Sequence, residues 1–162
     1  IFNCMNNIEE IWKPRVTVAA LLERDGHFLM VEERVAGKRV YNQPAGHLED
    51  GEGLVAAVVR ETLEETAWHF QPEALCGIYR WRHPQKQETW LRVAIAGEGL
   101  YHEPERELDA DIERVLWLTP DEIRARSNSL RSPMVLRTID DYLEGRRYSL
   151  DILEHIASDI GI

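Results

Sequence analysis

Three glutamates near the middle of the chain could hold a metal ion. Glu61, Glu64 and Glu65 stand at spacings i, i+3 and i+4, so on a helix their carboxylates project from one face. Carboxylate oxygens suit Mg²⁺ or Mn²⁺, which keep several waters and bridge protein carboxylates to substrate phosphates. Such an ion neutralises phosphate charge and lowers the pKa of a bound water. The spacing therefore favours hydrolysis of a phosphorylated compound, although an acidic face can also serve only to solvate an exposed helix.

A longer pattern surrounds these glutamates and extends from Gly46 to Trp68. The segment resembles the Nudix box, Gly-x5-Glu-x7-Arg-Glu-U-x-Glu-Glu-x-Gly-U, in which U is a bulky apolar residue. The fixed positions that match are Gly46, Glu52, Arg60, Glu61, Glu64 and Glu65. Thr62 replaces the first bulky apolar residue, and Ala67 replaces the second glycine. We expect Thr62 to pack at an edge of the core, and Ala67 to cost about 1 kcal/mol if the helix end needs a left-handed conformation.

The resemblance to Nudix hydrolases implies a metal site built from the box. Glu61, Glu64 and Glu65 are the implied ligands, and the carbonyl of Gly46 is a further candidate. The implied cofactor is Mg²⁺, with Mn²⁺ as an alternative. The substrate is then a small phosphorylated compound.

The same resemblance implies catalytic and supporting roles. Glu64 is the first candidate for the general base, because a metal-bound carboxylate can also hold the attacking water. Glu61 and Arg60 complete the expected catalytic set, with Arg60 orienting a glutamate through an ion pair; the alternative for Arg60 is an ordinary solvated surface position. Glu52 is expected to support the site from near the helix N-terminus, where negative charge is favourable in any case.

Residues outside the box could contribute an extra acid or contacts to the substrate. The candidate extra acids are Glu107, Asp109, Asp111 and Glu113, and the sequence does not choose among them. The candidate substrate-binding residues are Arg34, Lys38, Arg39, His47 and Arg131. Each of these charges could also simply be solvated at the surface. Tyr79, Trp81 and Trp90 could stack on a ring, but packing within a hairpin is the favoured interpretation.

Three flanking segments resemble a bacterial phosphatase subgroup of the Nudix family. They are the segments 42–49, 130–133 and 145–148. This resemblance implies release of orthophosphate from hydroxymethylpyrimidine pyrophosphate, thiamine pyrophosphate, or nucleoside di- and triphosphates. One alternative is a Nudix pyrophosphohydrolase of ADP-ribose or dinucleoside polyphosphates. Another is a Nudix domain that binds a nucleotide or a protein without turnover.

Secondary-structure patterns place the box between a hairpin and further strands. We expect strands over 15–23, 27–32, 39–43, 74–82, 88–96 and 114–118, a helix over 54–66, a long loop over 98–111, and helices that begin at 119–120 and 132–133. On the helix, Val55, Val59, Thr62, Leu63 and Thr66 should face the core, with the glutamates on the opposite side. Strands interspersed with helices predict an α/β fold, and the resemblance implies a Nudix-type α/β/α sandwich with a mixed sheet.

Composition limits the classes of protein and partner. The 162 residues suit one domain, 1–162, with a flexible terminus at about 1–10; the first four residues need not be native, because Met5 could be the start. The net charge of −10 makes nucleic acid an unlikely partner. No membrane-spanning run occurs, and two cysteines, Cys4 and Cys76, fit a reducing cytoplasm. Monomer and homodimer both remain open, and we expect residues 148–162 to pack within the chain.

Overall fold

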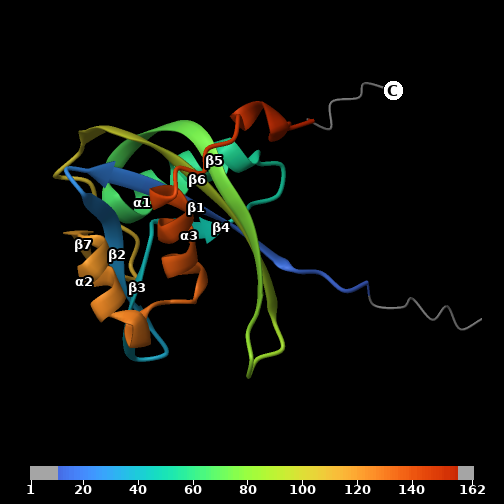
Figure 1. Cartoon of the computed structure of the whole chain (residues 1–162), viewed down its shortest axis with the longest axis horizontal. Coiled ribbons are helices and arrows are strands. Elements are labelled where there is room, and N and C mark those ends of the chain that lie inside the picture. Colours follow the sequence, from blue (N-terminus) through green and yellow to red (C-terminus); the bar gives the residue numbers. More distant parts are fainter. Residues whose placement is uncertain (1–10, 157–162) are drawn as a thin grey trace, which may run out of the picture.

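The computed structural model describes residues 11–156, and the expectations about residues 1–10 and 157–162 lie outside this range. The strands are β1 (Arg15–Arg24), β2 (His27–Val35), β3 (Lys38–Asn42), β4 (Ala45–His47), β5 (Trp68–Arg82), β6 (Thr89–His102) and β7 (Ile112–Leu118). The helices are α1 (Leu54–Thr66), α2 (Pro120–Ala125) and α3 (Met134–Leu143), with short 3₁₀ turns at Ser127–Ser129 and Leu150–Ile152. Figure 1 shows their arrangement.

The strands form one mixed sheet, ordered β3-β2-β1-β6-β5, with β4 paired to β1 and β7 paired to β2. The β1–β6 pairing is parallel and the other pairings are antiparallel. Strands β1 and β2 pair only next to their turn, at Glu23 with Phe28 and Arg24 with His27. Beyond the turn they diverge, which leaves the edge of β1 free to accept the short strand β4. Strand β4 therefore lies beside β1, the middle strand of the sheet order.

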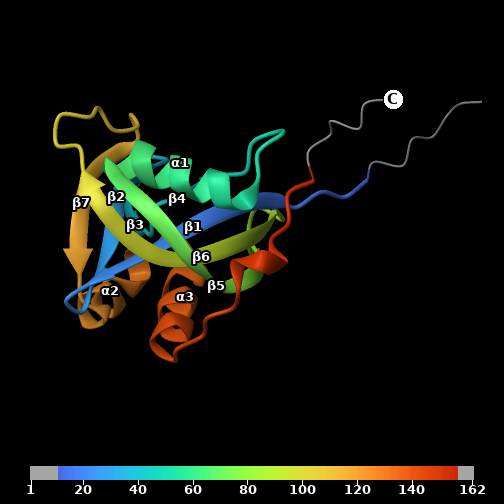
Figure 2. The same ribbon diagram turned by 90° about the horizontal axis from the view of Figure 1, so that it is seen from above.

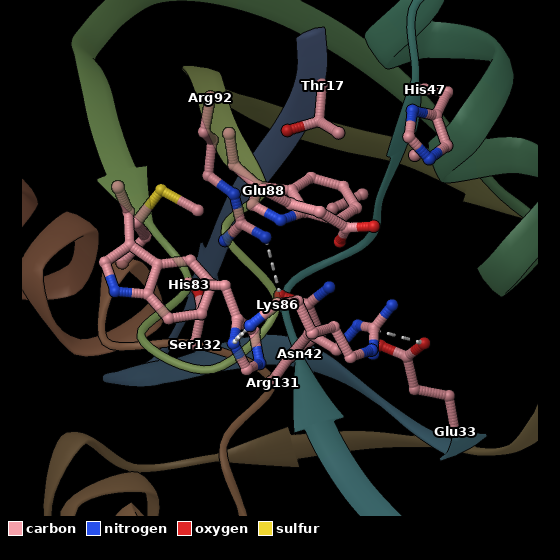
Figure 3. A pocket seen from close by; sticks show the side chains of 15 residues that line it. Thr17, Glu33, Asn42, His47, His83, Lys86, Glu88, Arg92, Arg131 and Ser132 are labelled. Carbon is pink, nitrogen blue, oxygen red and sulfur yellow. Dashed lines mark hydrogen bonds and ion pairs between the residues drawn. The ribbon is translucent and has the colours of Figure 1, made fainter. Parts of the chain in front are cut away.

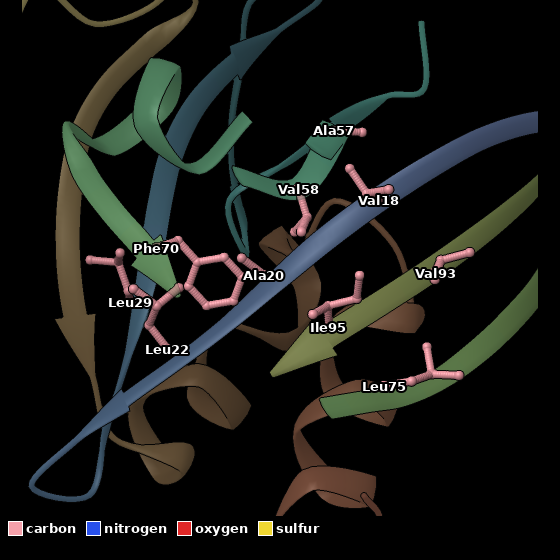
Figure 4. Packing of buried hydrophobic residues seen from close by; sticks show 10 residues of the cluster. All are labelled: Val18, Ala20, Leu22, Leu29, Ala57, Val58, Phe70, Leu75, Val93 and Ile95. Carbon is pink, nitrogen blue, oxygen red and sulfur yellow. The ribbon is translucent and has the colours of Figure 1, made fainter. Parts of the chain in front are cut away.

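Helices cover both faces of the sheet (Figure 2). Successive residues of β1 point to opposite faces, so Val18, Ala20 and Leu22 pack with Ala57 and Val58 of α1 (Figure 4). The alternate residue Leu21 packs with Ile123 of α2 and with Val135 and Ile139 of α3. Since both faces of β1 are covered, its run of apolar residues is continuous rather than alternating. The expected α/β/α sandwich with a mixed sheet is confirmed. The single-domain boundary at 1–162 stays a prediction.

The helix over 54–66 forms as expected, but its orientation differs from the expected one. The buried residues are Ala57, Val58, Glu61, Thr62, Glu65 and Thr66, whereas Val55, Val59 and Leu63 are only partly buried. Placing all three glutamates opposite the core was therefore wrong, because the side facing β4 is lined with Glu61 and Glu65. Thr62 is fully buried, not at a core edge, and its hydroxyl donates to the Val58 carbonyl at 2.7 Å.

Strands β5 and β6 are longer than the sequence indicated. β5 begins at Trp68 and β6 continues to His102, so the loop expected over 98–111 is reduced to residues 103–111. Register shifts break the alternation of β5, and Pro72 is tolerated there because β5 lies at the edge of the sheet. In β6, Gly97 is needed because a Cβ there would overlap the backbone of Gln71. Because of these bulges and glycines, the sequence pattern did not indicate the full length of β5 and β6.

Among the residues that the structure describes, none of the helices has the length and apolar character to cross a membrane.

Candidate active site

Strand β4 fixes two glutamates of α1 from the side of the sheet. The backbone N–H of Ala45 donates to the Glu65 carboxylate at 2.8 Å. The next residue, Gly46, lies directly against Glu61, because a Cβ built on Gly46 would overlap the carboxyl group of Glu61. Only glycine leaves room for that carboxylate in the position where Arg60 holds it. The first glycine of the box therefore has a steric role, and it brings its own backbone into contact with a candidate metal ligand.

Arg60 joins the remaining carboxylates of the box. It forms two hydrogen bonds with Glu52, from Nε at 2.8 Å and from Nη2 at 2.9 Å. Its Nη1 donates to Glu61 at 2.8 Å and to Glu64 at 3.0 Å, and Nη2 also donates to the backbone carbonyl of His47 at 3.0 Å. Arg60 is therefore not a freely solvated arginine, and it connects the loop before α1 to the acidic face of the helix.

Burial destabilises the charged forms of two of these glutamates. The exposed fraction of Glu61 and of Glu65 is 8% each. Loss of solvent is the main cause that raises the pKa of Glu65 well above its ordinary value. Burial likewise raises the pKa of Glu61, against the effect of Arg60, and the charges of Glu64 and Asp109 add to it. By contrast, the hydrogen bonds from Arg60 lower the pKa of Glu52.

The loop over 103–111 brings one candidate acid beside the helix. The backbone N–H of Asp109 donates to the carbonyl of Glu64 at 3.1 Å. Glu113 lies elsewhere, in β7, where it pairs with Arg34 at 2.5 Å and with Arg39 at 3.5 Å. Asp111 is exposed and accepts from the N–H of Arg34 through its carbonyl, and Glu107 is exposed. Of the four candidate acids, Asp109 is the one whose charge acts on both buried glutamates.

A cavity of about 150 Å³ opens on the other side of β4 (Figure 3). Among the candidate substrate-binding residues, His47 and Arg131 line it, whereas Arg34, Lys38 and Arg39 do not. Its lining residues are Thr17, Glu33, Asn42, Ala45, Gly46, His47, Trp81, His83, Lys86, Glu88, Trp90, Arg92, Arg131, Ser132 and Met134. Because Gly46 borders both the cavity and Glu61, the cavity and the acidic cluster adjoin.

The model of the NUDIX domain family matches residues 12–137, which is most of the chain. The chain belongs to the Nudix family. Phosphatase NudJ of Escherichia coli K12 is 42% identical over 143 residues, which cover 88% of this chain and 92% of that protein. NudJ of Shigella flexneri shows the same identity and coverage. The resemblance found in the box and its flanking segments is confirmed, and the chain is a Nudix hydrolase related to NudJ.

Solved Nudix structures support the same assignment. A Nudix hydrolase from Nitrosomonas europaea is 46% identical, with a TM-score of 0.89, and the match covers 91% of this chain and all of that one. A MutT Nudix hydrolase from Burkholderia pseudomallei is 22% identical with a TM-score of 0.69, covering 80% of this chain and 98% of that one. The second match shows the shared fold alone.

The carboxylates of the Nudix box have the donor chemistry that a hard divalent cation prefers, although their side chains are not grouped as a metal site over residues 11–156. Buried carboxylates are stable when a cation compensates their charge, and Glu61 and Glu65 are two such groups, beside the backbone of Gly46 and of Ala45 respectively. Over residues 11–156, no three Asp, Glu, His or Cys side chains are grouped closely enough to hold a metal ion. In this arrangement Glu61 and Glu64 accept from Arg60, and Glu65 accepts from Ala45. Arg60 thus supplies positive charge to Glu61 and Glu64.

Sequence reasoning missed the polar residues of the cavity. Thr17, Glu33 and Arg92 line it and come from segments with no motif, whereas Ser132 lies in the flanking segment 130–133 but was not among the candidates. One signal was present: Arg92 interrupts the apolar run of β6, and a charged residue in a covered strand is rarely buried without a partner. Trp81 and Trp90 are opposite each other in the β5–β6 hairpin, in keeping with the packing role predicted for them, but they also line the cavity.

Proposed function

We propose that this Nudix hydrolase is a Mg²⁺-dependent phosphatase that releases orthophosphate from small organic diphosphates. Its substrates would be compounds such as hydroxymethylpyrimidine pyrophosphate, thiamine pyrophosphate, or nucleoside di- and triphosphates. The observation that supports this most directly is the position of Gly46, which separates the buried Glu61 from a cavity large enough for an organic group. A diphosphate bound at the acidic cluster can therefore extend its organic end into the cavity. The relation to NudJ supports the phosphatase outcome.

The glutamates of α1 would hold the metal ion on the acidic side of that helix. Glu61, Glu64 and Glu65 supply carboxylate oxygens, and the Gly46 carbonyl is a candidate fourth ligand. When bound, Mg²⁺ neutralises phosphate charge and lowers the pKa of water; Mn²⁺ offers the same chemistry. Glu65 is already oriented by Ala45, so little side-chain freedom remains to be lost when it binds.

Proton transfer and positioning fall to the remaining side chains. Glu64 is less buried than its neighbours, with a side-chain exposure of 36%, and can accept a proton from an attacking water. Arg60 would hold Glu61 and Glu64 in position while remaining anchored to Glu52. Asp109 would add a further carboxylate from the loop. Attack of water on the terminal phosphorus breaks the phosphoanhydride bond and needs no covalent enzyme intermediate.

A phosphate-release screen followed by phosphorus NMR tests this function. Nucleoside diphosphates, thiamine pyrophosphate, hydroxymethylpyrimidine pyrophosphate, ADP-ribose and a dinucleoside polyphosphate are incubated with Mg²⁺ or with EDTA. We expect orthophosphate as the product of the small diphosphates. Release of inorganic pyrophosphate or of a sugar phosphate would indicate the pyrophosphohydrolase instead.

Two variants separate catalysis from binding. Glu64→Gln should lower kcat by roughly 10²–10⁴-fold if Glu64 is the base. Glu98→Gln is the matched control, because Glu98 is exposed on β6. A domain that only binds would show no Mg²⁺-dependent hydrolysis of any compound and unchanged ligand affinity in Glu64→Gln.

A further inference from the structure

The cavity beside β4 contains buried polar atoms that lack partners. Among the described residues, Thr17 Oγ1, Glu33 Oε1, Arg92 Nε and Ser132 Oγ are buried and make no hydrogen bond. All four residues line this cavity. Buried polar atoms are nearly always paired with protein, water or ligand, so several unpaired atoms around one cavity indicate a place where a bound molecule supplies the partners.

Strand register explains why some of these groups meet there. Thr17 of β1 stands opposite His47 of β4 and Arg92 of β6, so the three side chains emerge on the same face of the sheet. Trp90 lies two residues before Arg92 and shares that face. The centroids of the Trp90 and His47 rings are 5.5 Å apart. Ser132 approaches from the segment before α3. In Figure 3, Arg92 and Thr17 lie on one side of the cavity and Ser132 on the other. Polar groups and aromatic rings thus surround the same space.

Arg92 is held by two hydrogen bonds, while its Nε has no partner among the described residues. Its Nη1 donates to Gln43 at 3.0 Å and its Nη2 to Asn42 at 3.1 Å. Gln43 is fixed in turn by donating to the Val135 carbonyl at 2.9 Å. The exposed fraction of Arg92 is 4%, and burial lowers its pKa to about 10, so it stays charged at neutral pH. A fixed guanidinium with a free Nε–H is a preorganised donor.

Glu33 supplies an acceptor in the same cavity. One of its carboxylate oxygens is 4.0 Å from Nε of Arg131, at the limit of an ion pair, and the other has no hydrogen bond among the described residues. The hydroxyls of Thr17 and Ser132 can each donate or accept. The cavity therefore offers an acceptor from Glu33 and a fixed donor from Arg92, together with two adaptable groups.

We propose that this cavity binds the organic group of the diphosphate, and that Thr17, Glu33, Arg92 and Ser132 select a single ring with a hydrogen-bond donor next to an acceptor. The placement of the diphosphate rests on the proposed function. The size supports one ring, since a cavity of about 150 Å³ accommodates benzene. An amino group beside a ring nitrogen complements the polar atoms, because the amino group donates to Glu33 and the ring nitrogen accepts from a hydroxyl or from Arg92. Trp81, Trp90 and His47 provide surfaces for the ring faces.

Binding of the ring alone tests the cavity independently of hydrolysis. The full chain, labelled with ¹⁵N, is titrated with 4-aminopyrimidine and, as a control of the same shape, with unsubstituted pyrimidine. We expect shifts of the backbone amides of Thr17, Arg92 and Ser132, and an affinity at least about tenfold higher for the amino compound. Equal affinities, or shifts confined to other parts of the chain, would overturn the proposal. Ring binding without hydrolysis of any diphosphate would support the cavity and contradict the proposed function.

Kinetics of hydroxyl-deletion variants test specificity. Thr17→Val and Ser132→Ala remove one polar atom each with little change of shape, and Thr89→Val is the control, because Thr89 is also buried in a strand but does not line the cavity. With CDP, each cavity variant should raise KM about five- to tenfold and change kcat less than twofold. With methyl diphosphate, which has no ring, neither constant should change. An equal effect on both substrates, or no effect on CDP hydrolysis, would overturn the proposal. If the parent protein hydrolysed neither substrate, the proposed phosphatase activity would be contradicted, and the pyrimidine titration would decide on the cavity.

Discussion

The guanidinium group of Arg60 forms a two-point hydrogen-bonded pair with the carboxylate of Glu52, at 2.8 and 2.9 Å. The side chain of Arg60 is 23% exposed and that of Glu52 is 15% exposed. Glu52 lies in the loop before α1, and Arg60 lies on the helix beside Glu61 and Glu64. We therefore propose that Glu52 acts on the candidate metal ligands through Arg60, and that both are positioning residues.

Replacing Arg60 by lysine should impair catalysis while keeping the positive charge. An ammonium cannot contact Glu52 at two points and reach Glu61 and Glu64 at the same time. We expect kcat to fall about 10–100-fold, as is typical when a residue that orients metal ligands is changed. The measurement is Mg²⁺-dependent phosphate release.

A double-mutant cycle tests whether Glu52 acts through Arg60. Glu52→Gln should have an effect of similar size, and the double variant should be little worse than Arg60→Lys. Additive losses would mean that Glu52 acts without Arg60.

Replacing Gly46 by alanine should disturb Glu61 directly. The added methyl group overlaps the carboxyl group of Glu61, so we expect a loss of about 1–3 kcal/mol in unfolding free energy, together with loss of activity. The double variant Gly46→Ala/Glu61→Ala removes the overlapping group. It should regain stability in urea unfolding but not activity. If the double variant were as unstable as Gly46→Ala, the overlap with Glu61 would not be the cause.

Asp109 should matter more than its neighbours in the loop. Its backbone is bonded to Glu64, and its charge acts on Glu61 and Glu65. Asp109→Asn should lower activity about 10–100-fold or weaken Mg²⁺ activation by a similar factor. Glu105→Gln, in the same exposed loop, is the control and should remain within twofold. Similar behaviour of the two variants would exclude a special role for Asp109.

Mg²⁺ should stabilise the folded protein, because it compensates the buried charges of Glu61 and Glu65. At about one hundred times its dissociation constant, a ligand adds roughly 2.7 kcal/mol, which raises Tm by roughly 5–10 °C for a chain of this size. EDTA should reverse the rise, and NaCl of equal ionic strength should not reproduce it. The double variant Glu61→Gln/Glu65→Gln should show no rise. An unchanged rise in that variant would place the ion elsewhere.

Glu32 should determine part of the stability in acid. It is 1% exposed and accepts from Arg114 Nη2 at 2.6 Å, with Arg39 Nε at 3.0 Å. The hydrogen bonds from Arg114 lower the pKa of Glu32, so its stabilisation is complete above about pH 4.3 and is lost as the pH falls through the lowered value. At pH 7, Glu32→Gln should lose about 1–2 kcal/mol, because both arginines remain solvated. The difference from the parent should narrow below pH 4 in urea unfolding, whereas Glu98→Gln should match the parent throughout.

Much of the candidate site could be predicted because its spacing is local. The helical repeat places Glu61, Glu64 and Glu65 on one side of α1 irrespective of the rest of the fold. The hairpin strands expected over 15–23 and 27–32 and the helix expected to begin at 119–120 also follow from local patterns, and the capping box between Thr119 and Glu122 is present at that helix start. Ala67 also takes the left-handed conformation that the box glycine would adopt, with φ of 58°.

The orientation of α1 and the cavity depend on contacts between distant parts of the chain. The helical repeat shows which residues share a side, but β4 decides that Glu61 and Glu65 are buried. The Thr17–Arg92 pairing joins residues 75 positions apart in the sequence, and no local pattern encodes that register. Sequence by itself therefore determined the family and the carboxylates that α1 displays. The tertiary structure alone decided which of them are desolvated and which polar atoms face the cavity, because burial and strand pairing are set by long-range packing.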